Sequence, residues 1–176
     1  MPPDPDHPIF IHNAGLVLLN PYLPALFERL GLITRNEEGL PRIEGIEAQS
    51  RAVHLLQYMA DGRTDAPEPV LVLNKLLSGV AVAQPIEPGI TPTEAEIETC
   101  NGLLNAVIAN WTIIKNTSID GLRETFLQRE GRLKHSSDRW DLQVQRKGLD
   151  VLVDQIPWTF STIYHRWMAD PVHVTW

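Results

Sequence analysis

Residues 111–133 read WTIIKNTSIDGLRETFLQREGRL, and this stretch marks where helices give way to strands. It closes one helix and opens the next, expected over 118–128, with Thr117 or Ser118 as the N-cap. Gly131 is a suitable stop for that helix, and a strand pattern follows it directly. The stretch is rich in residues that define boundaries and poor in residues that do chemistry. This balance favours a positioning or docking role over an enzyme.

Further helices are expected on the N-terminal side of this stretch. In residues 23–30 the apolar side chains recur every three or four positions, which indicates one buried stripe. The last of these helices is expected to start with Thr91 as its cap, Pro92 as its first residue and Glu94 three positions after the cap. Residues 34–45 are polar and turn-rich, so we expect an exposed loop there. The expected helical ranges are 16–19, 23–30, 46–60, 69–77 and 91–110.

Strand patterns dominate the C-terminal part of the chain. Residues 132–135 and 140–146 alternate apolar with polar side chains around a short polar turn, which predicts a β-hairpin. The predicted fold class is α+β, with an N-terminal helical portion of about five helices followed by a small, mostly antiparallel β-sheet. Other expected strands are 9–12, 162–167 and 172–176, while 149–154 fits either a strand or a short helix. The expected organisation is a Pro-rich leader or linker over 1–8 and a single α+β domain over 9–176, with a helical part at 13–130 and a β-rich part at 131–176.

Composition excludes several classes of protein. The chain has 176 residues, a net charge of −7 and one cysteine, Cys100. The acidic balance argues against a partner that is a nucleic acid or an anionic membrane, because such proteins concentrate Lys and Arg. A single cysteine excludes an intramolecular disulfide framework and a multi-cysteine zinc site. No apolar run reaches the roughly 18 residues that span a bilayer, so no membrane insertion is expected.

The usual sequence signatures of catalysis are missing. There is no G-x-S-x-G elbow, no P-loop and no Gly-x-Gly-x-x-Gly run, and the six histidines show no close ligand spacing. Cys100 lies inside an expected helix, away from the helix N-terminus that would stabilise a thiolate, so a packing or surface role is expected. No catalytic, cofactor-binding or metal-binding residue is therefore predicted, and no cofactor. Convergence of His12, His165 and His173 in one pocket would instead allow a small hydrolase with a His-based site.

The tryptophans are the remaining candidates for a functional surface. Trp140, Trp158, Trp167 and Trp176 all lie in the last 37 residues of the chain. Large rings allow a thin sheet to bury enough area, since each Trp hides about 150–250 Å². The same rings are typical anchors of a binding interface. Both interpretations stay open, and the four residues are the candidate interface.

Several long segments of the chain, taken in order, resemble the C-terminal region of contractile injection system tape measure proteins. The resemblance covers nearly the whole chain from Ile9 onward, and several long motifs in the right order are far more specific than one short pattern. The segments are IHNAGLVLLNPYLPALFERLG (11–31), RAVHLLQYMADG (51–62), VLNKLLSG (72–79), NTSIDGLRETFLQREG (116–131), VQRKGLDVLVD (144–154), IPW (156–158) and WMADPVHVTW (167–176).

This resemblance implies a part in a bacterial, phage-tail-like particle whose inner-tube length a tape measure protein sets. Family members are usually much longer, with an extended segment ahead of this region, so the chain resembles the compact anchor more than the ruler. The implied function is a non-enzymatic assembly and docking domain. The implied partners are the tube, hub or spike, baseplate or cap proteins. The implied location is the bacterial cytoplasm during assembly, with retention in a released or membrane-anchored particle also compatible.

A third hypothesis is a peptide- or cargo-binding adaptor that uses an exposed strand edge at 172–176.

Overall fold

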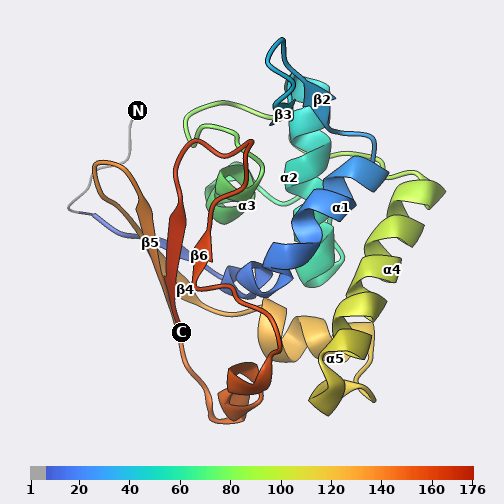
Figure 1. The fold of residues 1–176 in the computed structure, drawn as a ribbon, viewed down its shortest axis with the longest axis vertical. Coiled ribbons are helices and arrows are strands. Elements are labelled where there is room, and N and C mark those ends of the chain that lie inside the picture. The colour runs from blue at the N-terminus through green and yellow to red at the C-terminus, as the bar shows by residue number, and fades with distance from the viewer. Residues whose placement is uncertain (1–6) are drawn as a thin grey trace.

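The computed structural model describes residues 7–176, and a five-stranded mixed sheet forms one side of the fold (Figure 1). The strands lie in the order β1, β4, β5, β7, β6. All neighbouring pairs are antiparallel except β5 and β7, which are parallel. One face of the sheet packs on the helices, and the strand residues alternate between that buried face and an exposed one. The strand bounds are β1 Ile9–Ile11, β4 Gly131–His135, β5 Trp140–Val144, β6 Thr162–Ile163 and β7 Val172–Thr175.

The helical layer combines α-helices with short 3₁₀ segments. The α-helices are α1 Leu23–Arg29, α2 Ile46–Asp61, α3 Val72–Leu77, α4 Glu94–Asn110 and α5 Ile119–Leu122. The 3₁₀ helices are η1 Ala14–Tyr22, η2 Glu68–Val70, η3 Thr112–Ile114, η5 Gly148–Val151 and η6 Val153–Gln155, and a π-helical turn, η4 Arg123–Leu127, continues α5. Gly62 directly follows the last residue of α2 and caps the helix. Its positive φ of 81° suits glycine, and its N–H donates to Tyr58 O at 2.8 Å.

The predicted fold class was wrong in its arrangement. Helices and strands are interspersed: β1 comes from the N-terminal end of the chain, and η5 and η6 lie between β5 and β6. The sheet is mixed because β7 runs parallel to β5. A parallel pair needs a long crossover connection, here residues 145–171. Alternating side chains show which residues face the core, but they carry no information about strand direction.

Several local predictions also need correction. The expected loop at 34–45 contains a small hairpin, β2 Thr34–Arg35 and β3 Pro41–Arg42. The expected strand 162–167 is only two residues long, as β6. The leader expected over 1–8 lies largely outside the described residues.

The start of α4 was misplaced by two residues. Thr93 is the N-cap, and it exchanges hydrogen bonds with Glu96 in a capping box. The sequence contains two overlapping Thr-x-x-Glu patterns, and the second one forms. Glu96 is nearly buried and also accepts two hydrogen bonds from Arg51 on α2, at 2.6 and 2.7 Å. These bonds from Arg51 hold the pKa of Glu96 below its usual value.

The 111–133 stretch joins the helical layer to the sheet. Ser118 caps α5 by accepting a hydrogen bond from Gly121 N–H at 3.0 Å, as expected. The Trp111 ring is fully buried with its centroid 4.7 Å from that of Phe126, and its indole N–H donates to Leu152 O at 3.0 Å. Gly15 packs directly on η4, because a Cβ at that position would lie 1.9 Å from Phe126 O. The stretch therefore sits between the N-terminal helix, the sheet and the crossover connection.

Candidate docking site

Two of the four candidate tryptophans belong to the core. Trp140 and Trp167 are both under one-tenth exposed. The Trp167 indole N–H donates to Leu77 O at 2.8 Å, at the end of α3, and its ring packs edge-on against Phe27 with centroids 5.5 Å apart. The Trp167 ring therefore attaches the β-rich end of the chain to the helices, and neither ring leaves much surface for a partner.

Trp158 and Trp176 keep part of their surface accessible. They line one shallow hollow together with Phe160, and its volume is about 300 Å³. The Trp158 indole N–H donates to Leu18 O at 2.8 Å, and the ring meets Tyr22 edge-on at 5.3 Å. The partly buried aromatic rings are thus held rigidly, a property that favours a contact surface. A partner-binding role for these rings stays a prediction.

A buried ion pair holds the Trp176 ring in place. Arg129 and Asp150 are both fully buried and form two parallel hydrogen bonds, while the Trp176 indole N–H donates to Asp150 Oδ2 at 2.7 Å. The Arg129 guanidinium also lies over the Trp176 ring, 5.2 Å from its centroid. Burial alone would raise the pKa of Asp150, but the hydrogen bonds from Arg129, Trp176 and Lys147 N–H outweigh it and lower that pKa.

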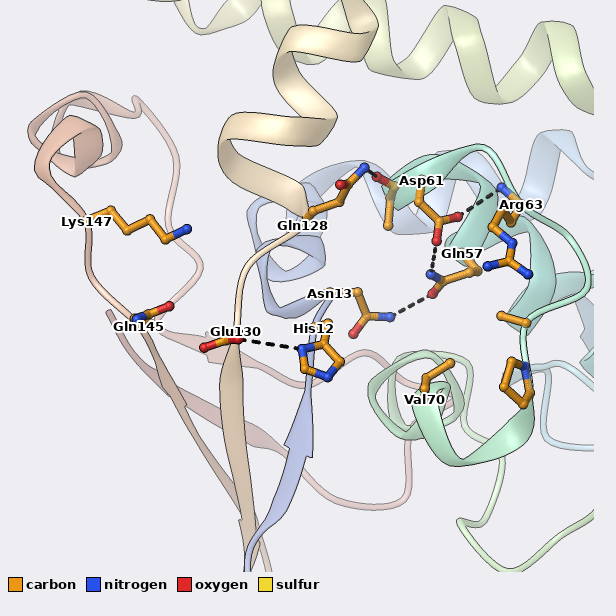
Figure 2. A pocket seen from close by; sticks show the side chains of 13 residues that line it. His12, Asn13, Gln57, Asp61, Arg63, Val70, Gln128, Glu130, Gln145 and Lys147 are labelled. Atoms are coloured by element: carbon orange, nitrogen blue, oxygen red, sulfur yellow. Dashed lines mark hydrogen bonds and ion pairs between the residues drawn. The ribbon is translucent and has the colours of Figure 1, made fainter.

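A large cleft lies between the end of the sheet and the helices (Figure 2). Its volume is about 770 Å³, within the usual range of ligand sites. One wall comes from the end of β1, the start of β4 and the chain after β5. The opposite wall comes from the end of α2 and the loop that leads into η2. The lining residues are His12, Asn13, Gln57, Ala60, Asp61, Arg63, Ala66, Pro67, Val70, Gln128, Glu130, Gln145 and Lys147.

A chain of carboxamides forms the floor of this cleft. The Asn13 amide donates to Gln57 Oε1 at 2.8 Å and to Asn74 Oδ1 at 2.7 Å. Gln57 donates in turn to Asp61 Oδ2 at 2.8 Å. Figure 2 shows the line from Asn13 through Gln57 to Asp61, with the Asn13 oxygen on the side away from Gln57. Asn13, Gln57 and Asn74 are buried, so this network fixes the orientation of each amide.

Sequence reasoning missed this polar floor. Asn13 belongs to no recognised motif, and Gln57 and Asn74 lie inside helical patterns. The available signals were Gln57 in α2 and Asn74 in α3, each a polar residue on an otherwise apolar helix face. Only the fold brings the three amides together, from the residue ahead of η1, from α2 and from α3.

The three histidines of the hydrolase alternative do not meet. His12 lines the large cleft, His165 lines a separate hollow beside α1, and His173 lies on β7 opposite Asp141 and Thr162. Within residues 7–176, no group of three His, Cys, Asp or Glu side chains is placed to hold a metal ion. The geometry gives the His-based hydrolase no common site.

Cys100 is a buried packing residue. Its side chain is fully enclosed, and burial raises the pKa of the thiol to about 12. Such a thiol carries almost no thiolate at neutral pH, and the thiolate is the nucleophilic form. Of the packing and surface roles expected for Cys100, its burial selects the packing role.

The strand edge of the adaptor hypothesis is covered. β7 lies between β5 and β6, and Val174 N–H also donates to Ser161 O at 2.8 Å. The edge strands of the described sheet are β1 and β6 instead. An adaptor that adds a peptide strand to residues 172–176 is therefore not supported.

Comparison with known proteins assigns the chain to a family. A family model described as contractile injection system tape measure protein matches residues 1–176. No curated protein and no solved structure matches the chain. Among the described helices, none is both long and apolar enough to cross a bilayer. Because the family match extends over the whole chain, the resemblance of the sequence segments is confirmed, and the protein belongs to the contractile injection system tape measure protein family.

Proposed function

We propose that this chain is a non-enzymatic docking and assembly domain of a tape measure protein. It helps to set inner-tube length by anchoring to a tube, hub, spike, baseplate or cap component of the injection particle. The observation that carries the proposal is the family match along the entire chain, combined with a folded body in place of an extended one.

The compact size of the fold supports the role of an anchor over that of a ruler of tube length. A folded chain of 176 residues has a radius of gyration of about 16 Å by the general scaling. Fully extended, the same residues would reach about 600 Å at 3.3–3.6 Å each. The Arg129–Asp150 pair and the tryptophan hydrogen bonds join residues far apart in sequence, and they resist such extension.

Two surfaces support a docking role. Trp158 and Trp176 are partly buried rings whose accessible surface is held in place by indole hydrogen bonds. The cleft above Asn13 offers polar groups with fixed orientation. The net charge of −7 would complement a basic surface on a partner. The small-hydrolase alternative has no supporting arrangement of its histidines.

A pull-down of the purified chain against each purified particle component tests the proposal. The expected result is retention of at least one tube, hub, spike, baseplate or cap protein by the folded chain. Circular dichroism of the same preparation confirms that the bait is folded. If a folded bait retains none of the components, the docking function is refuted.

A further inference from the structure

The cleft at the end of the sheet is lined by groups that match a peptide backbone. Asn13, Gln57, Gln128 and Gln145 contribute four carboxamides to its lining. Each carboxamide carries a donor and an acceptor, the same pair that a peptide group presents. Gln57 uses both groups within the protein and Gln128 donates to Ala60 O at 3.0 Å, whereas Asn13 Oδ1 has no donor among the described residues and the Gln145 side chain is exposed. Most small-molecule sites are instead predominantly apolar with few polar groups. The lining therefore favours a ligand that alternates donors and acceptors along its length.

Asn13 supplies a buried acceptor that the protein does not use. Asn13 is only 3% exposed, and both of its observed hydrogen bonds are donated by its nitrogen, to Gln57 and Asn74. Its Oδ1 atom has no donor among the described residues. Buried acceptors are almost always paired, and an unpaired one is costly. Asn13 lines the cleft, and its oxygen lies on the side away from Gln57 (Figure 2), so it is a lining acceptor without a donor from the described residues.

The charges around the cleft fit a peptide better than a polyanion. Arg63 and Lys147 stand near the acidic Asp61 and Glu130, so the rim carries both signs. A nucleic acid or a phosphate group would meet repulsion from the two carboxylates. A polypeptide tolerates a mixed rim, because its own side chains carry either sign. Pro67 and Val70 add an apolar wall on the α3 side that can receive a small aliphatic side chain.

We propose that this cleft binds an extended peptide segment of a partner in the injection particle. Asn13 Oδ1 accepts a backbone N–H of that segment, and Gln145 and Lys147 contact its carbonyl groups from the sheet side. This inference rests on the proposed docking function and names the surface that performs it. It is distinct from strand addition at residues 172–176, because the contact is made by side chains of the cleft.

The test measures binding of synthetic peptides to the full chain. Overlapping peptides that cover each tube, hub, spike, baseplate and cap protein are labelled and titrated by fluorescence polarisation. The variant Gln145→Ala/Lys147→Ala removes two exposed groups from the cleft wall. The matched control Lys115→Ala/Gln155→Ala removes the same residue types from exposed positions outside the cleft lining.

The expected result is that at least one peptide binds the wild-type chain and the control with equal affinity. The cleft variant should bind it about tenfold or more weakly, which corresponds to about 1.4 kcal/mol. Equal binding by the cleft variant would overturn the proposal while leaving the docking function intact. Binding of a folded component with no binding of its peptides would also overturn the proposal, because recognition would then need a folded surface. Failure of every intact component to bind would refute the docking function itself.

Discussion

Replacing Asp150 by alanine should destabilise this fold more than any other single loss of charge. Asp150 and Arg129 are both fully buried, and the carboxylate accepts hydrogen bonds from Arg129, the Trp176 indole and Lys147 N–H. Asp150→Ala removes the carboxylate and leaves the Arg129 guanidinium buried without its counter-charge. Removal of one partner of a buried ion pair costs about 3–5 kcal/mol. That is a large share of the roughly 5–15 kcal/mol that stabilises a typical domain.

Urea unfolding followed by far-ultraviolet circular dichroism measures this cost, and thermal melting provides a second reading. A loss of about 3–5 kcal/mol corresponds to a fall in Tm of about 6–20 °C for a chain of this length. A double-mutant cycle with Arg129→Met isolates the pair. The double variant should cost less than the sum of the two single variants, because it removes the uncompensated charge.

The control is the exposed pair formed by Arg146 and Asp154, whose side chains are 44% and 57% exposed. Asp154→Ala should leave the unfolding midpoint essentially unchanged, because solvent screens an exposed pair. The reasoning is refuted if Asp150→Ala changes the free energy of unfolding by less than about 0.5 kcal/mol, the range of ordinary surface substitutions. It is also refuted if the costs of Asp150→Ala and Arg129→Met simply add.

Three further predictions follow from close packing and titration. Gly15→Ala should lower the free energy of unfolding by at least about 1–3 kcal/mol in urea titrations, because the new methyl group meets Phe126 O and the helices must move apart. Stability should fall as the pH drops through and below about 4: the lowered pKa of Asp150 in the folded state means that its contribution is present above its ordinary pKa and lost on acidification. Thermal melts from pH 7 to pH 3 measure this loss. Cys100 should react with a thiol reagent at pH 8 only after unfolding, because burial raises its pKa to about 12.

Each of these predictions has a clear contrary result. If the Gly15→Ala variant is as stable as the wild-type protein, η1 does not pack closely against η4. For the titration, Asp150→Asn should weaken the acid dependence, and an unchanged pH profile in that variant would assign the effect to other carboxyl groups. Rapid labelling of Cys100 in the native protein would contradict its enclosure in the core.

Local signals in the sequence located the helices well and several strands. α2 was expected over 46–60 and occupies Ile46–Asp61, because its apolar stripe and the following glycine are both local features. The β4–β5 hairpin was also expected, since alternation and a polar turn are adjacent in sequence. The start of α4 was misplaced because Glu96 is selected by Arg51, a residue on another helix.

Features that depend on distant parts of the chain were beyond sequence reasoning. The parallel pairing of β5 with β7 depends on how residues 145–171 cross the fold, and no pattern within either strand encodes it. The carboxamide network at the cleft likewise needs Asn13 from the start of the chain, Gln57 from α2 and Asn74 from α3. The sequence named the tryptophans as candidates, but only the structure separates the buried Trp167 from the partly exposed Trp176.

The length of the inner tube tests the central claim most directly. Particles are assembled in the presence and in the absence of this chain, and tube lengths are measured by negative-stain electron microscopy. If this domain anchors the tape measure protein, its removal should abolish tubes of uniform length or prevent tube assembly. A tube-length distribution identical to that of particles assembled with the chain would contradict the account.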